Sequence, residues 1–253
     1  PQAGDGCTRV KTGCRARKKV TARKSNGSMK SNKEHPAAHA PSHESSSVID
    51  FHSRTRVVFG AGCLSRLKEF VKAKRVLLVI DPALAHLTET VEKLLPRIKV
   101  HAISDVSPNP DSAAVERGRA FAATHDPDFI IGLGGGSAMD TAKAINFVLT
   151  NGGAIQDYWG YGKAKKKMLP SLGIPTTAGT GSEAQSFCLI SDAVTHRKLA
   201  CGDPKAAFQT ALLDPELTLT QPHVVTAAAG YDAISHAVES FVSTKSNFIS
   251  RMF

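Results

Sequence analysis

The chain has 253 residues, of which 42% are hydrophobic and 21% charged, and its formal net charge is +10. This length allows one large domain or two smaller ones, while no stretch approaches the roughly 20 apolar residues of a membrane-spanning helix, so we expect no membrane partner. The five cysteines are scattered and form no CxxC pair, which indicates neither a disulfide framework nor a zinc ribbon and favours a reducing compartment.

The positive charge is concentrated in residues 1–47. This segment holds ten of the 32 Lys and Arg residues and three of the 22 Asp and Glu residues, so it carries +7 and the other 206 residues carry only +3. It contains no Leu, no Phe and no apolar periodicity. Such a segment cannot offset the entropy cost of ordering itself, and we predict a disordered basic leader.

This leader has several interpretations. Its acid-poor composition up to about Lys33 weakly resembles an organelle transit peptide. The basic run at 15–19 is of the kind that contacts nucleic acid or a nuclear import receptor. The favoured interpretation is a solvated leader, or translated sequence upstream of a start at Met29, because short basic patterns often arise by chance. We therefore expect a cytoplasmic protein without a nucleic-acid partner, with organelle targeting as the alternative.

Predicted strands and helices alternate after residue 48. Short β-branched runs predict buried strands at 56–59, 75–80, 99–103, 129–133 and 172–174. Amphipathic patterns predict helices between them at 62–72, 86–95, 111–124 and 137–149. This alternation is typical of an α/β fold with a parallel sheet and right-handed crossovers, in which ligands bind at the carboxyl ends of the strands.

The pattern changes to helix alone from Thr220 onward. Thr220 is a plausible N-cap with Pro222 in the first turn, and an Ala-rich run leads to Gly230. A second helix is predicted from about 231 to 242. We interpret this part as the opening of an all-helical domain.

The first motif with chemical meaning is GLGGGSAMDTAK at 132–143. It follows a predicted strand and opens a helix, where glycines let backbone N–H groups and the helix N-terminus approach a phosphate. Ser137 and Asp140 have capping-box spacing, which would set the start of the helix. The alternative is a tight strand-to-helix turn without a ligand.

The second motif is IPTTAGTGSE at 174–183, again directly after a strand. Its hydroxyls and glycines offer many hydrogen-bonding groups over a short loop, which suits a diphosphate or a ribose. An ordinary loop rich in Gly, Ser and Thr is the alternative.

The third motif is DAISHAVE at 232–239. On a helix Asp232 and His236 lie one turn apart on one face, with Glu239 beside them. A carboxylate and an imidazole at this spacing can bind one divalent cation. The alternative is an exposed Asp–His pair of small energetic value.

Taken together, the three motifs, with DPEL at 214–217 before the third, closely resemble the iron-containing (group III) alcohol dehydrogenase family. The resemblance extends over about 57–253. It implies a Rossmann-like, dinucleotide-binding α/β domain at 48–219, the beginning of an all-helical domain at 220–253, and a metal in the cleft between the two domains.

The resemblance also implies an NAD site. Its contacts would be the pyrophosphate at Gly135, Gly136 and Ser137, cofactor-lining side chains at Thr176 and Thr177, and further contacts at Asn109 and Lys198. Asp81 falls where the family places an acid on the adenine ribose. Because a carboxylate there accepts from the 2′-hydroxyl and repels a 2′-phosphate, we favour NAD over NADP. A simple Asp-Pro turn is the alternative for Asp81.

The resemblance makes Asp232 and His236 the first two ligands of a metal site. This mixed donor set suits Fe(II) and Zn(II) and does not choose between them. The family takes two further histidine ligands from positions downstream of Phe253. With two of four ligands a metal would bind weakly, so we expect the 253-residue chain to be an inactive fragment.

The function implied by the resemblance is a metal- and NAD-dependent alcohol dehydrogenase, which transfers hydride between a small alcohol and NAD and in reverse reduces an aldehyde or ketone. We expect the full-length enzyme to be a homo-oligomer. A glycerol dehydrogenase or a hydroxyacid-oxoacid transhydrogenase relative is an alternative. In another class, the chain would be a non-catalytic nucleotide-binding fragment.

Overall fold

The computed structural model describes residues 52–252, which belong to one compact unit. The predicted leader at 1–47 lies outside the described residues, so its disorder and any targeting role stay predictions. No helix within 52–252 combines the length and the apolar character that crossing a bilayer requires.

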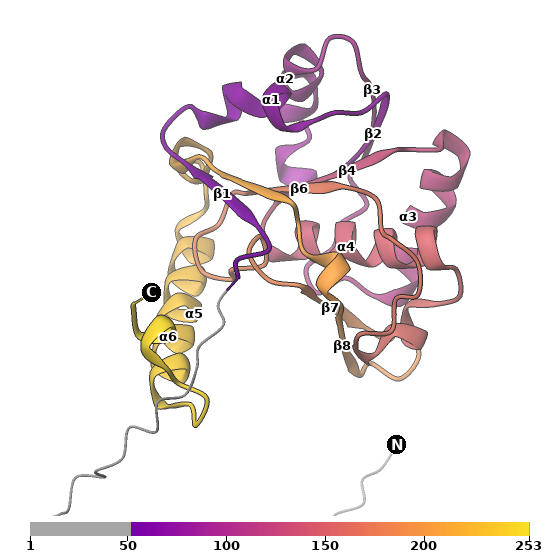
Figure 1. Cartoon of the computed structure of the whole chain (residues 1–253). Coiled ribbons are helices and arrows are strands. Elements are labelled where there is room, and N and C mark those ends of the chain that lie inside the picture. The colour runs from indigo at the N-terminus through magenta and orange to yellow at the C-terminus, as the bar shows by residue number, and fades with distance from the viewer. Residues whose placement is uncertain (1–51, 253) are drawn as a thin grey trace, which may run out of the picture. The chain divides into compact units, whose positions relative to one another are not determined.

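A six-stranded parallel sheet forms the centre of this unit, in the order β1-β9-β6-β4-β2-β3 (Figure 1). Its strands are β1 (Arg56–Phe59), β2 (Arg75–Ile80), β3 (Lys99–Ile103), β4 (Phe129–Gly134), β6 (Ser171–Pro175) and β9 (Thr210–Leu213). All paired neighbours run parallel. The predicted α/β, Rossmann-like parallel sheet is confirmed, and each predicted strand lies within an observed one.

Helices cover both faces of this sheet (Figure 1). They are α1 (Leu67–Phe70), α2 (Leu87–Leu94), α3 (Ser112–His125) and α4 (Gly136–Asn151). Short 3-10 turns occur at Cys63–Arg66, Pro82–Leu84, Ile155–Tyr158, Pro204–Ala206 and Pro215–Thr218. The predicted helix at 62–72 is confirmed in part: the 3-10 turn at Cys63–Arg66 leads into α1, and the helical stretch ends at Phe70. The other three predicted helices match within two residues.

Strand β2 shows how the core divides. Leu77 and Val79 pack in the cluster that contains Ile145 of α4, whereas Val76 and Leu78 pack in the cluster that contains Val91 of α2. Successive side chains of a strand point to opposite faces. A strand covered by helices on both faces is therefore apolar throughout, which explains the unbroken run at 76–80.

A second, three-stranded sheet was not predicted. It consists of β5 (Gly160–Tyr161), β7 (Phe187–Ser191) and β8 (Lys198–Gly202), and β7 pairs with β8 antiparallel. It packs against α4 through β7. Its strands have only two to five residues, so each apolar run is too short to be distinguished from a loop in the sequence.

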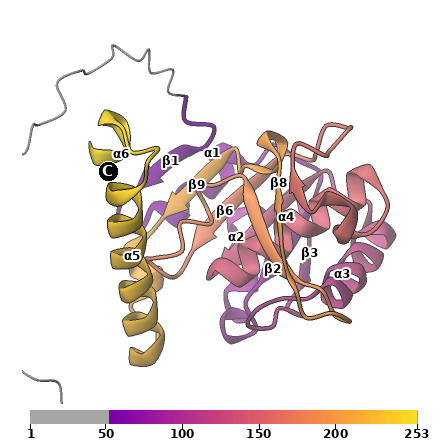
Figure 2. The same cartoon turned by 90° about the horizontal axis from the view of Figure 1, so that it is seen from below.

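Residues 220–252 form helices only, as predicted, but in a different division. One helix, α5 (His223–Val242), runs straight through Gly230, and a short α6 (Phe248–Met252) follows. The N-cap of α5 is Pro222 rather than the predicted Thr220. A glycine inside a helix costs only about 1 kcal/mol relative to alanine, so Gly230 does not end it. Figure 2 shows α5 standing beside the sheet.

Candidate functional site

A cavity of about 910 Å³ lies at the carboxyl ends of β2, β4 and β6. The predicted cofactor residues that line it are Asp81, Gly135, Gly136, Ser137, Thr176 and Thr177. Asp232 of α5 lines the same cavity. The structure therefore brings one predicted metal ligand and most of the predicted cofactor contacts to a single cavity.

The N-terminus of α4 forms part of the wall of this cavity. Its N-cap is Gly135, and no side chain caps the helix, so the predicted capping box is wrong. The carboxylate of Asp140 instead accepts hydrogen bonds from Ser182 Oγ at 2.5 Å and from Leu189 N at 3.0 Å. The N–H groups of the first turn are left without a side-chain acceptor, and the helix dipole adds positive potential at this end, which favours an anion such as a phosphate.

The glycine turn packs closely against the loop that follows β6. A Cβ atom on Gly135 would lie 3.3 Å from Thr177 Cγ2, and one on Gly136 would lie 3.1 Å from Thr180 Cγ2. The Oγ1 atom of Thr177 is buried and has no hydrogen-bond partner within 52–252. An unpaired buried hydroxyl costs about 1–3 kcal/mol. A polar ligand in the cavity would relieve that cost, so these residues fit a dinucleotide.

Asp81 lies directly after β2. Its Oδ1 accepts from Ala83 N at 3.0 Å, which makes it the N-cap of the turn at Pro82–Leu84. The side chain also lines the cavity, so the turn and the cofactor interpretations are compatible. Gly134 must be glycine here, since its φ is +143° and a Cβ atom would lie 2.9 Å from that of Asp81.

Asn109 and Lys198 contact each other. Lys198 Nζ, at the start of β8, donates to Asn109 Oδ1 at 2.9 Å. Asn109 adopts a left-handed conformation with φ of 56°. Neither residue lines the cavity, although the adjacent Pro108 does. The structure thus places this predicted pair at the rim and not in the wall.

The predicted metal ligands face each other on α5, with 3.8 Å between His236 Nε2 and Asp232 Oδ1. His236 Nδ1 lies 3.2 Å from the carbonyl oxygen of Gly179. Because a carbonyl oxygen only accepts, the ring hydrogen belongs on Nδ1, and Nε2 keeps the lone pair that a metal needs. Between residues 52 and 252 no further His, Cys, Asp or Glu completes a cation site. The donor set therefore fits part of a metal site.

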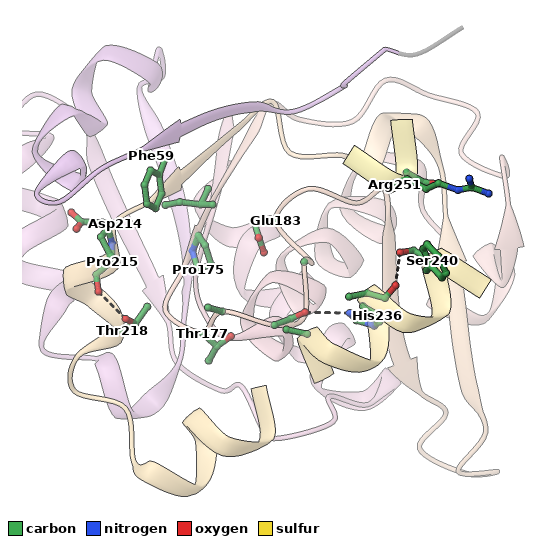
Figure 3. A pocket seen from close by; sticks show the side chains of 18 residues that line it. Phe59, Pro175, Thr177, Glu183, Asp214, Pro215, Thr218, His236, Ser240 and Arg251 are labelled. Carbon is green, nitrogen blue, oxygen red and sulfur yellow. Dashed lines mark hydrogen bonds between the residues drawn. The ribbon is translucent and has the colours of Figure 1, made fainter. Parts of the chain in front are cut away.

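A second cavity, of about 930 Å³, is lined in part by His236 (Figure 3). Its wall includes Phe59, Glu183, His236 and Phe241, and Thr177 lines both cavities. Burial raises the pKa of Glu183 above its usual value, and the charge of the nearby Lys143 opposes this shift only in part. Asp232 faces the first cavity and His236 the second, so the candidate metal pair lies where the two cavities meet.

Gly179 is a site residue to which the sequence assigned no role. A Cβ atom there would lie 2.1 Å from the carbonyl oxygen of Ala229 on α5. Only glycine lets α5 approach the loop this closely. A glycine among the hydroxyls of the second motif is the only signal in the sequence, and it does not reveal the partner helix.

The open parallel sheet, with helices on both faces and a glycine turn at a strand end, defines a Rossmann-like α/β fold. The profile of the iron-containing alcohol dehydrogenase family matches residues 54–215. The chain belongs to this family.

Named relatives agree with this assignment. "Alcohol dehydrogenase 4" of Schizosaccharomyces pombe is 39% identical over 210 residues, which are 80% of this chain and 50% of that protein. The "NAD-dependent methanol dehydrogenase" of Bacillus methanolicus is 37% identical over 74% of this chain and 51% of its own length. The crystal structure of a "1,3-propanediol oxidoreductase" matches with a TM-score of 0.76 and 29% identity, over 81% of this chain and 56% of the other. The chain thus spans about half the length of these relatives.

Proposed function

We propose that this chain supplies the NAD-binding domain and two metal ligands of an alcohol dehydrogenase, which transfers hydride between an alcohol carbon and NAD. The observation that carries the proposal is the shared cavity. Residues at the carboxyl ends of three strands and Asp232 of α5 line one space at the end of the sheet where α/β folds bind ligands.

The cofactor would be held mainly by main-chain groups. The uncapped first turn of α4 would bind the pyrophosphate, and the unpaired hydroxyl of Thr177 would hydrogen-bond to the cofactor. Asp81 would accept from the adenine ribose, and Asn109 with Lys198 would contact the cofactor from the rim. The relative named "NAD-dependent methanol dehydrogenase" supports NAD as the cofactor.

Asp232 and His236 would supply two ligands to Fe(II) or Zn(II), either of which suits the donor set. A bound divalent ion supplies Lewis-acid stabilisation of the alkoxide form of an alcohol. The role of this chain is to orient the ligands: the Gly179 carbonyl holds the His236 ring so that Nε2 faces Asp232. A complete coordination sphere needs ligands besides these two.

A small alcohol or aldehyde as substrate and self-association rest on the family alone, whereas a cytoplasmic location rests on the composition of the sequence. Relatives that act as a glycerol dehydrogenase or a transhydrogenase would share this cofactor cavity. The second candidate function is nucleotide binding without catalysis. It is favoured by one observation, the absence of a third metal-ligating side chain within 52–252.

Fluorescence titration with NADH tests the proposal. Gly136→Asp should abolish binding, because its carboxylate would lie against the pyrophosphate and crowd Thr180. The matched control is Ala113→Asp, which adds the same carboxylate to the exposed first turn of α3, away from the cavity. Equal NADH affinity in both variants would contradict the cofactor site.

Activity separates the two candidate functions. We expect the 253-residue chain to produce no NADH from alcohols, even with added Fe(II) or Zn(II), because two ligands hold a metal weakly. Metal-dependent turnover that disappears in His236→Ala would show instead that this chain assembles a working metal site.

A further inference from the structure

The most buried cation among the described side chains belongs to Lys143. Its residue is 2% exposed and lies on α4, seven positions after Gly136. Its Nζ donates to the Ser182 carbonyl oxygen at 2.5 Å, to Ser182 Oγ at 3.2 Å and to the Phe187 carbonyl oxygen at 2.8 Å. Three acceptors match the three N–H bonds of an ammonium group, so the contacts fit the charged form.

Asp140 compensates the buried charge. It lies one turn before Lys143, and the Ser182 hydroxyl that accepts from Lys143 donates to its carboxylate. Burial lowers the pKa of Lys143 and raises that of Asp140, and the charge of each group opposes the shift of the other. A buried charge is retained only when it is paired and hydrogen-bonded in this way.

These bonds fasten one end of the loop at 176–182. The other end is fastened by Thr176 N, which donates to the Gly134 carbonyl oxygen at 2.9 Å. Between the two ends lie Thr177, which packs on the glycine turn, and Gly179, whose carbonyl oxygen meets His236. The conformation of this one loop therefore decides how the cofactor turn and α5 are placed relative to each other.

We propose that Lys143 is a positioning residue that, together with Asp140 and Ser182, clamps the loop at 176–182, so that the loop presents Thr177 to the cofactor turn and the Gly179 carbonyl to His236. The clamp would couple the cofactor cavity to the metal pair although Lys143 touches neither. That the cavity binds NAD and that Asp232 and His236 bind a metal rests on the proposed function, whereas the clamp itself does not.

Two readouts distinguish positioning from a merely structural contribution. The first is the dissociation constant for NADH from fluorescence titration. The second is the tautomer of His236, observed at pH 8 through long-range proton–nitrogen correlations of its imidazole. A structural contribution alone would lower the melting temperature and leave both readouts of the folded protein unchanged.

Lys143→Met removes the ammonium group and keeps the apolar stem. We expect it to weaken NADH binding at least about tenfold, which corresponds to about 1.4 kcal/mol, and to reduce the population of the Nδ1–H tautomer of His236. Ser182→Ala keeps the ammonium but removes the bridge to Asp140, and it should shift both readouts in the same direction by a smaller amount. If Lys143→Met does not fold, Ser182→Ala decides the question.

Lys205→Met is the matched control. Lys205 Nζ also donates to a carbonyl oxygen, that of Ala164 at 3.0 Å, and to Asp203, but it lies outside the loop. Both readouts should stay at wild-type values. Folded Lys143→Met and Ser182→Ala proteins with unchanged NADH affinity and an unchanged His236 tautomer would overturn the clamp while the proposed function stands. A wild-type chain that binds no NADH contradicts the proposed function instead, and the tautomer readout still tests the clamp.

Discussion

The central sheet and helix α5 differ in how well the described residues cover their apolar side chains. All residues of β4 are buried, whereas no residue of α5 is, and its Ile234 and Phe241 are 63% and 66% exposed. Elements with few buried contacts have low local stability. The sheet therefore provides a rigid surface for the cofactor that we propose, while the candidate metal pair lies on a helix that the loop at Gly179 helps to hold.

The largest expected effect is on stability and tests the contrast between the buried sheet and the exposed helix α5. Leu78→Ala removes a fully buried side chain and should lower the free energy of unfolding by about 2–5 kcal/mol. Ile234→Ala on α5 should change it by less than about 0.5 kcal/mol. Urea unfolding followed by circular dichroism measures both. A cost for Ile234→Ala close to that for Leu78→Ala would show that α5 belongs to the same cooperative core.

The next prediction concerns the contact that joins the two regions. In Gly179→Ala the new methyl group would collide with the Ala229 carbonyl, so α5 must move away from the loop. Because Ala229 and Asp232 line the cofactor cavity, we expect NADH affinity to fall by roughly tenfold, about 1.4 kcal/mol. The neighbouring exposed Ala178→Ser is the control. An unchanged NADH affinity would show that the position of α5 does not affect binding in the cavity.

The next prediction concerns Asp81, at the end of strand β2, and the preference for NADH over NADPH. Asp81→Asn keeps the shape of the side chain but removes the charge that repels a 2′-phosphate. The ratio of NADPH to NADH affinity should rise by several-fold, roughly 1 kcal/mol. Competitive fluorescence titration measures it, with the exposed Asp105→Asn as a control. A constant ratio would leave Asp81 as a turn residue only.

The smallest effect concerns the β7–β8 hairpin and depends on pH. Hydrogen bonds from Thr195 and Gln156 lower the pKa of Asp192 to about 2. Because the folded pKa lies below the unfolded value of about 4, this stabilisation is complete above that pH and is lost as the pH falls towards 2. Asp192→Asn should therefore melt below wild type at pH 6, with a smaller difference at pH 2.5. An equal difference at both pH values would contradict the assignment.

Much of the fold follows from local patterns. The run at 76–80 predicts a strand buried on both faces, and the glycines at 132–136 predict a turn that opens a helix at a strand end. Asp232 and His236 share a helix face because the helical period alone brings them together. These features depend on residues close in the sequence, so the sequence predicts them.

Other features depend on partners that are distant in the sequence. Asp140 has the spacing of a capping residue, yet its carboxylate accepts hydrogen bonds from Ser182 and Leu189. Gly230 suggests a helix boundary, yet α5 continues through it. For Asp140, tertiary hydrogen bonds outweigh a local capping preference of about 1 kcal/mol. For Gly230, a helix cost of about 1 kcal/mol is too small to end a 20-residue helix.

Local residue patterns are enough to predict a parallel α/β protein with a glycine turn and a hydroxyl-rich loop after two of its strands. Three contacts are visible only in the folded chain: Lys143 fastens that loop, Gly179 admits α5, and Lys198 donates to Asn109. Strand and turn patterns reflect local backbone preferences and burial. The meeting of two loops is decided by sheet order and side-chain packing, which leave no periodic trace in the sequence.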